Sequence, residues 1–118
     1  MDAHELYESG GAHDSAGRAD EAIPLYEQAL AAGLPDSERR RALLQLGSSL
    51  RNVGRIDESV ALLAAARLEY PDFRPLRAFL ALALHSAGRS EEALAELLNA
   101  IADEGDYERS LRAYASEL

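Results

Sequence analysis

The chain of 118 residues contains no cysteine, no tryptophan and no lysine, and aromatic residues form only 6 % of it. The absence of cysteine excludes disulfides, thiolate nucleophiles and Cys-ligated zinc or iron–sulfur sites. The N-terminal stretch MDAHELYESG is acidic and lacks the basic start and apolar core of a signal peptide, and no segment approaches the length of a membrane span. We therefore expect a soluble, cytoplasmic protein that forms a single domain over residues 1–118.

Positive charge is also scarce in this sequence. The formal net charge is -9, and all twelve basic residues are arginines. Sequence-independent binding to nucleic acid and attraction to anionic membranes both depend on Lys and Arg, so we expect neither nucleic acid nor membrane as a partner. The exclusive use of Arg, together with an excess of Ala and Leu, suggests a GC-rich bacterial source.

Ala and Leu, which dominate the apolar residues, are strong helix formers and favour an all-α fold. A short phrase also recurs along the chain: GRADEA at 17–22 returns as GRIDES at 54–59 and as GRSEEA at 88–93. Apolar residues with helical spacing precede and follow each phrase. The unit is thus predicted to be helix, tight turn, helix, with Gly ending the first helix. We expect helices near 2–15, 19–32, 37–53, 56–69, 73–87 and 90–103.

Each copy of the phrase carries adjacent acidic residues, such as Asp20 and Glu21. Paired carboxylates can act as general acid and base, but these pairs recur with the repeat at helix starts, where they stabilise the positive end of the helix dipole. His4, His13 and His85 lack the spacing of a helical metal site. With no nucleophile–base pair and no phosphate-binding loop, we predict a non-enzymatic protein without cofactor or metal.

The repeat does not resume after Gly105. The remaining segment, 106–118, places Tyr107, Leu111, Tyr114 and Leu118 on one helical face. We interpret it as a seventh helix whose apolar stripe covers the open end of the last repeat, as the terminal caps of solenoids do.

With these residues in place, the sequence resembles the tetratricopeptide repeat (TPR) family, whose unit of about 34 residues has a W-x2-L-G-x2-Y, A-x3-F and P pattern. The middle copy matches best, and its matching residues are Leu43, Leu46, Gly47, Leu50, Ser59, Leu63 and Pro71. The resemblance implies a right-handed α-solenoid of three helix-turn-helix repeats, approximately 3–36, 37–73 and 74–105, with 106–118 as the capping helix. It also implies a non-enzymatic adaptor or scaffold that holds a peptide or helix of another protein in a concave groove.

Transferring the family's groove positions to this sequence gives a candidate binding surface. Its residues are Tyr7, Arg41, Leu44, Gln45, Ser48, Arg51, Asn52, Leu82 and His85, with Gly11 and Ala78 beside them. An apolar floor flanked by Arg suits a helix or extended peptide with acidic residues. The Lys and Asn clamp by which one branch of the family holds acidic chaperone tails is missing, because those positions hold Tyr7, Gly11, Gln45 and Phe79.

A second hypothesis belongs to a different class of function. The first helix has no repeat before it, so its outer apolar edge could build a homodimer, which would make the chain a self-associating structural protein. Light scattering separates the two, since an adaptor is expected to be monomeric and the alternative is a concentration-dependent dimer.

Overall fold

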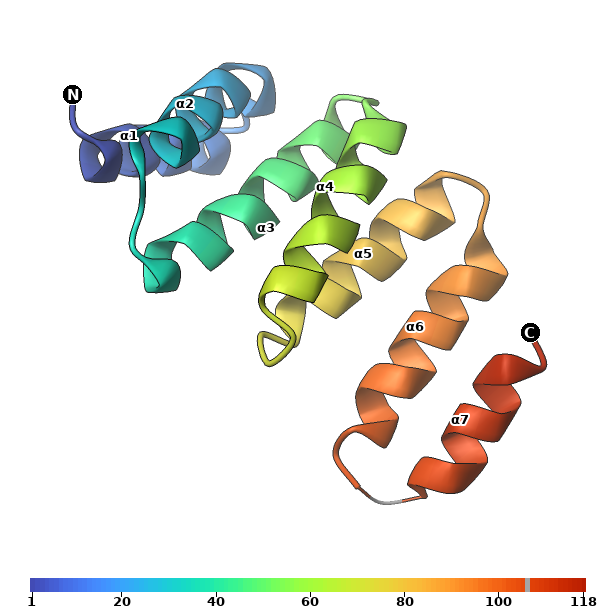
Figure 1. Cartoon of the computed structure of the whole chain (residues 1–118). Coiled ribbons are helices and arrows are strands. Elements are labelled where there is room, and N and C mark those ends of the chain that lie inside the picture. Colours follow the sequence, from blue (N-terminus) through green and yellow to red (C-terminus); the bar gives the residue numbers. More distant parts are fainter. Residues whose placement is uncertain (106) are drawn as a thin grey trace.

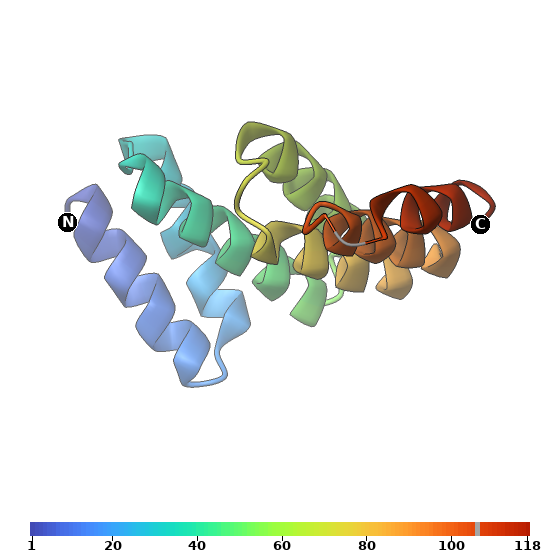
Figure 2. The same cartoon turned by 90° about the horizontal axis from the view of Figure 1, so that it is seen from below.

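The computed structural model describes residues 1–105 and 107–118, and within these residues every regular element is an α-helix. The helices follow one another along an elongated molecule of 49 × 28 × 20 Å (Figures 1 and 2). Their bounds are α1 Ala3–Ser15, α2 Ala19–Ala32, α3 Asp36–Asn52, α4 Ile56–Glu69, α5 Pro75–Ser86, α6 Ser90–Ala102 and α7 Glu108–Ser116. The predicted all-α repeat solenoid is confirmed, and the first six helices begin and end within two residues of the expected positions.

The recurring Gly-Arg phrase forms the turn inside each helix pair. Gly17, Gly54 and Gly88 adopt φ of 79°, 86° and 78°, a left-handed conformation that costs glycine nothing because it has no Cβ. The next amide then closes the helix end, as when Arg18 N donates to His13 O at 2.9 Å, which is the Schellman arrangement. The same bond recurs from Arg55 to Leu50 and from Arg89 to Leu84, both at 2.9 Å.

The arginine of the phrase has a role of its own. Its side chain pairs with the Glu three residues later: Arg18 with Glu21 at 3.1 Å, Arg55 with Glu58 at 2.6 Å and Arg89 with Glu92 at 2.9 Å. The Glu thus stands in the first turn of the second helix and meets both an Arg and the helix dipole. The Glu of each acidic pair therefore forms part of the turn, whereas the helix-dipole role of the pairs stays a prediction.

In each of the first two helix pairs, a glycine of one helix faces a large side chain of the other. In the first pair, a Cβ placed on Gly10 would lie 2.8 Å from the ring of Tyr26, which is fully buried and donates its hydroxyl to Asp14 at 3.0 Å. In the second pair, a Cβ on Gly47 would overlap the side chain of Leu63. Ser59 adds a buried hydrogen bond to the carbonyl of Gly47 at 2.6 Å.

Each following pair covers the one before it. Leu46 and Leu50 of α3 pack with Ile23 and Tyr26 of α2 in one buried cluster. Leu80 and Leu84 of α5 share a second cluster with Leu63 of α4. The core is therefore a chain of small clusters along the solenoid, in which each helix pair completes the burial of its predecessor.

The seventh helix does not cover the last pair in the predicted way. Its buried side chain is Ala115, at 7 % exposure, whereas Tyr107, Leu118 and Tyr114, the last at 63 %, are exposed and only Leu111 of the predicted stripe is half-buried. Arg112 connects α7 to the end of α6 instead, through an ion pair to Asp103 and a hydrogen bond to Asn99. The prediction of an apolar stripe over the open end is wrong in this respect, because the sequence pattern does not show which side of α6 the helix meets. Asp106, the predicted first residue of the cap, lies outside the described residues.

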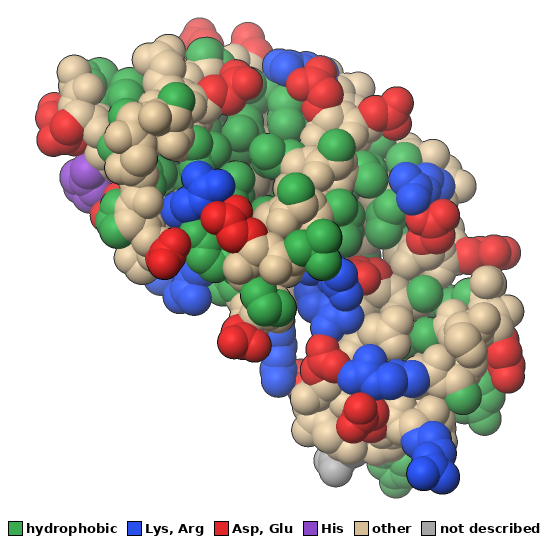
Figure 3. Space-filling model, in the orientation of Figure 1, with side chains coloured by type: hydrophobic (Ala, Val, Ile, Leu, Met, Phe, Trp, Pro, Cys, Tyr) green, Lys and Arg blue, Asp and Glu red, His purple; other side chains and the backbone are tan. Residues whose placement is uncertain are grey.

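Acidic and basic side chains lie side by side over this C-terminal end of the molecule (Figure 3). Ion pairs on the exposed surface there include Arg74 with Glu104 at 3.0 Å and Arg112 with Glu108 at 3.1 Å.

Replacing Gly47 with Ala tests the close approach of α3 and α4. Although Ala is the better helix former by about 1 kcal/mol, the new methyl group would overlap Leu63, and we expect a net loss of about 1–3 kcal/mol of unfolding free energy. Gly11→Ala is the matched control, since nothing lies within 4 Å of its Cβ and stability should rise slightly. Denaturant unfolding measures both, and equal effects of the two substitutions would contradict the packing.

A second pair of substitutions tests how α7 is attached. Ala115→Asp places a charge in a buried contact and should lower the melting temperature, whereas Tyr114→Asp, one residue earlier and exposed, should leave it nearly unchanged. If Tyr114→Asp proved the more destabilising, the helix would face α6 as the sequence predicts. Thermal unfolding followed by circular dichroism gives the comparison.

Candidate functional site

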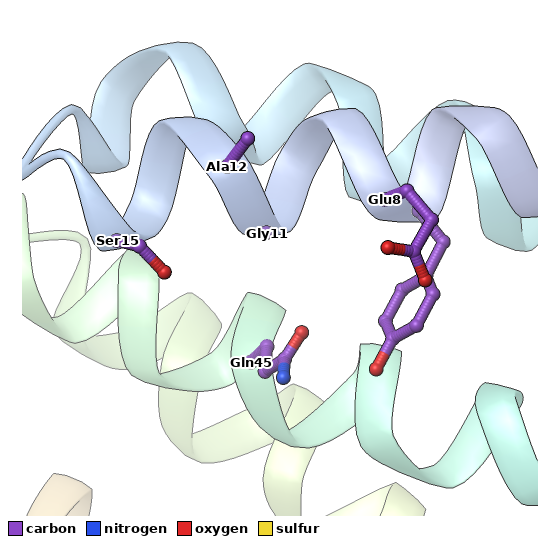
Figure 4. Close-up of a pocket in the computed structure, with 6 residues that line it drawn as sticks. Glu8, Gly11, Ala12, Ser15 and Gln45 are labelled. Atoms are coloured by element: carbon purple, nitrogen blue, oxygen red, sulfur yellow. The ribbon is translucent and has the colours of Figure 1, made fainter.

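A hollow opens between α1 and α3, the first helices of the first two pairs. Its lining residues are Tyr7, Glu8, Gly11, Ala12, Ser15 and Gln45, and its volume is about 310 Å³. Figure 4 shows Gln45 of α3 reaching toward the face of α1 that carries Gly11, with Glu8 and Ser15 to either side. We call this feature the α1–α3 hollow. Gly11 and Ala12 carry little or no side chain, which leaves the space open.

Tyr7 forms the apolar end of the hollow. Its ring packs at 45° on Tyr26 with the ring centroids 6.3 Å apart, so a core aromatic holds it in place. Burial raises the pKa of the Tyr7 phenol, and the positive charge of Arg41 acts in the opposite direction. The phenol and the guanidinium therefore lie near each other at the border between α1 and α3.

The arginines of α3 differ in how they are neutralised. Arg39 forms a two-pronged pair with Glu69 of α4 at 2.8 and 3.1 Å, and Arg40 lies 4.6 Å above the ring of Phe73. Arg41 and Arg51 have no acidic side chain within 4.0 Å among residues 1–105 and 107–118. They stand on the helix that also supplies Gln45.

Several polar atoms on α3 are also buried without a hydrogen-bond partner in the described part of the chain. They include Nε of Arg40, Nε of Arg51 and Oε1 of Gln45. Buried polar groups are nearly always hydrogen-bonded, so such atoms mark a surface that a ligand or water completes. Gln45 and Arg51 are six residues apart, which places them about 120° apart around the same helix.

Acidic side chains lie where α1 and α3 begin. His4 lies 3.2 Å from Glu38 and 3.9 Å from Glu8, so it ties the start of α1 to the first turn of α3. The hydrogen bond and charge of Glu38 raise the pKa of His4, with Glu8 and Asp2 adding to the effect. Acidic groups thus surround one end of the hollow, and arginines lie along α3.

A second hollow, of about 290 Å³, lies between α5 and α6 and is nearly all apolar. We call it the α5–α6 hollow; Leu82, Leu94 and Leu97 line it together with Ala residues, and His85 stands at its edge. His85 is within 2.7 Å of the Ser90 hydroxyl. Leu82 and His85, which the sequence assigned to one groove, thus line a hollow separate from that of Tyr7 and Gln45.

The remaining predicted groove residues lie on α3. Arg41 and Asn52 are exposed, and Ser48 is half-buried. Leu44 is also half-buried and packs against the central core cluster, so it serves the scaffold as well as the surface. The predicted groove residues therefore fall into three groups: the α1–α3 hollow, the exposed side of α3, and the α5–α6 hollow.

Comparison with known proteins now identifies the family. A family model described as tetratrico peptide repeat matches residues 3–118, nearly the whole chain. The chain belongs to the tetratricopeptide repeat family. No curated protein is significantly similar to it in sequence.

One solved structure with the same TPR fold is that of YrrB, described as "a TPR protein with an unusual peptide-binding site". It matches with a TM-score of 0.79 at 22 % identity, over 100 % of this chain and 58 % of the YrrB chain. This chain therefore spans little more than half the length of that protein, and the likeness is one of fold.

The TPR register also explains which lining residues the sequence analysis missed. Glu8, Ala12 and Ser15 were not among the predicted groove residues, although Glu8 and Ser15 stand 37 residues before Gln45 and Asn52, which were. The spacing between the first two Gly-Arg phrases is also 37. Applying the same repeat register to α1 would have found both residues.

Among the described residues, no group of three or more His, Asp or Glu side chains is arranged to hold a metal ion. Within the same residues no helix is both long and apolar enough to cross a membrane.

The His4 bridge predicts how stability varies with pH. Because the pKa of His4 is raised in the folded chain, its contribution is complete below the unfolded value of about 6.5 and is lost as pH rises through the folded pKa. The melting temperature should therefore fall slightly across this range, and His4→Gln should flatten that fall. His85→Gln is the control that should preserve it; identical pH profiles for the two variants would contradict the bridge. Thermal melts at a series of pH values provide the measurement.

Proposed function

We propose that this TPR chain is a protein-interaction module that binds a peptide or helix of a partner protein across the α1–α3 hollow and the adjoining side of α3. The observation that carries the proposal is the state of the α3 arginines. In a chain of formal net charge -9, Arg41 and Arg51 are left without an acidic partner among the described residues, on the helix that lines the hollow.

The electrostatics favour a ligand with acidic residues on one side. Arg is well suited to recognise carboxylates because its guanidinium donates two parallel hydrogen bonds. Glu8 of α1 and Glu38 in the first turn of α3 disfavour a uniformly acidic ligand. The expected ligand is therefore amphipathic, with carboxylates along α3 and an apolar side chain against Tyr7.

The size of the hollow supports a peptide. A volume of about 310 Å³ is at the lower end of small-molecule sites and accommodates one or two side chains, while the exposed side of α3 continues the contact on Ser48 and Asn52. TPR proteins generally bind other proteins or peptides and are not enzymes, and YrrB is described as having a peptide-binding site. A cytoplasmic adaptor in a bacterium remains our prediction for the chain, with no cofactor, nucleic acid or membrane involved.

Selection from a random peptide display library on the wild-type chain, followed by direct binding of the selected peptides, tests the proposal. We expect the double variant Arg41→Glu, Arg51→Glu to weaken binding by at least about tenfold, equivalent to about 1.4 kcal/mol, and high salt to weaken binding of the wild type. The matched control is Arg55→Glu, Arg89→Glu, which makes the same charge change at two exposed turns.

If the control weakened binding as much as the α3 variant, net charge rather than the α3 surface would govern recognition. If neither variant weakened it, the ligand would bind elsewhere and the proposed surface would be wrong. Unchanged circular dichroism spectra establish that each variant is folded.

A further inference from the structure

The α6 helix carries an apolar stripe that the fold leaves uncovered. Leu94, Leu97 and Ile101, spaced at i, i+3 and i+7, lie on one helical face, and all three are exposed, Leu97 at 39 %. Exposed Leu82 lies beside them and lines the α5–α6 hollow with Leu94 and Leu97. We call Leu94, Leu97 and Ile101 the α6 stripe; Leu82 of α5 is its neighbour. Apolar patches of this kind on soluble proteins commonly mark interaction surfaces.

The earlier repeats show what covers this stripe elsewhere in the chain. Leu97 stands 34 residues after Leu63, which in turn stands 37 after Tyr26, and these equivalent side chains are 1 % and 0 % exposed. Tyr26 is covered by Leu46 and Leu50 of α3, and Leu63 packs in one cluster with Leu80 and Leu84 of α5. By comparison with these repeats, the stripe is a surface on which a helix carrying leucine side chains can pack.

Helix α7 does not cover the α6 stripe. It meets α6 near Asn99 and Asp103, to which Arg112 hydrogen-bonds, on a side of the helix away from the stripe. With nine residues it is also shorter than α3 or α5. The stripe on the third repeat therefore remains open although the chain continues past it.

The opposite end of the solenoid is closed by polar groups. Between residues 2 and 52, all of which are described, no large hydrophobic side chain is exposed. The exposed side chains near the start of α1 are polar instead: they are His4, Glu5 and Glu8, and Asp2 forms a capping box with Glu5. The apolar outer edge predicted for the first helix is therefore not observed, and dimerisation through that edge is not supported.

We propose that a second copy of this chain covers the α6 stripe, with the two α6 helices packed antiparallel across a two-fold axis. The surface is self-complementary. The leucine side chains that project from α6 of one copy can enter the α5–α6 hollow of the other copy, and the reverse contact forms at the same time. A two-fold contact uses the same patch on both copies and closes after two, so the polar N-terminal ends point away and no filament forms.

The size of the surface sets the strength of this dimer. At 1.5 Å per residue α5 and α6 are about 20 Å long, and two helices about 10 Å apart present a face of roughly 20 by 20 Å on each copy. The two copies together would bury roughly 800 Å², below the ~1,200 Å² of stable specific interfaces, so we expect a weak, reversible dimer with a dissociation constant on the order of 100 micromolar. Because each copy carries a formal charge of -9, salt should strengthen the dimer by screening repulsion, the opposite of its effect on an Arg-mediated ligand.

Sedimentation equilibrium of the full chain over a range of concentrations tests the dimer. We expect monomer and dimer in exchange, with more dimer at high salt, and we expect Leu94→Glu to yield monomer throughout. Val53→Glu is the control, because Val53 has the same 39 % exposure as Leu97 but lies in the turn after α3. The Val53→Glu variant should dimerise as the wild type does.

Cross-linking provides a second measurement that does not depend on a charged variant being folded. Since the chain has no cysteine, Leu97→Cys introduces a single thiol near the proposed axis, and mild oxidation should form a covalent dimer. Val53→Cys should not form one under the same conditions.

Three outcomes would overturn the proposal. These are a wild-type chain that is monomeric at all concentrations, a dimer that survives Leu94→Glu, and a dimer that salt dissociates. In the first case the stripe would be left for a helix of a different protein. None of these results bears on the arginines of α3, so the peptide-binding proposal stands or fails separately.

Discussion

The close contact of a glycine on the first helix of a pair with a large side chain on the second determines the rest of the structure. At Gly10 with Tyr26, and again at Gly47 with Leu63, the absence of a Cβ lets the two helices approach until the large side chain fills the space between them. That side chain then forms the floor on which the next helix rests. Each pair thus sets the position of its successor, and the solenoid extends by repetition of one local contact.

The third helix pair lacks this glycine contact and is not covered in the same way. Ala81 stands at the position of Gly10 and Gly47, and Leu97 stands at that of Tyr26 and Leu63. The helix that comes next, α7, leaves Leu97 exposed. The contacts of Arg112 with Asn99 and Asp103 hold α7 on another side of α6. Leu94, Leu97 and Ile101 therefore stay exposed, and the described chain has polar exposed side chains on α1 and apolar ones on α6.

Electrostatics divide the molecule in a second way. Most of the arginines are engaged locally, in the turns with the Glu three residues later or across helices as in Arg39 with Glu69. These pairs are exposed and contribute little to stability. Their effect is to leave Arg41 and Arg51 as the cations on α3 that can meet a ligand, in a chain whose overall charge would otherwise repel acidic partners.

Much of the architecture could be predicted from the sequence. The three Gly-Arg phrases locate the turns because only glycine adopts φ near 80° without strain, and helical spacing around them predicts six helices within two residues of their observed bounds. The sequence could not show that the predicted groove residues line two separate hollows. Leu82 and Gln45 occupy similar faces of α5 and α3, yet they line different hollows, because each hollow depends on which helix packs beside it.

The sequence by itself thus determined the repeat, its turns and the family to which the chain belongs, since these follow from local conformational preferences and short-range spacing. The tertiary structure alone decided which arginines have partners, which side of α6 receives α7 and which leucines stay exposed. These features depend on contacts between side chains distant in sequence, such as Arg112 with Asn99 or Arg39 with Glu69. An amphipathic pattern states that a face is apolar, and only packing shows what covers it.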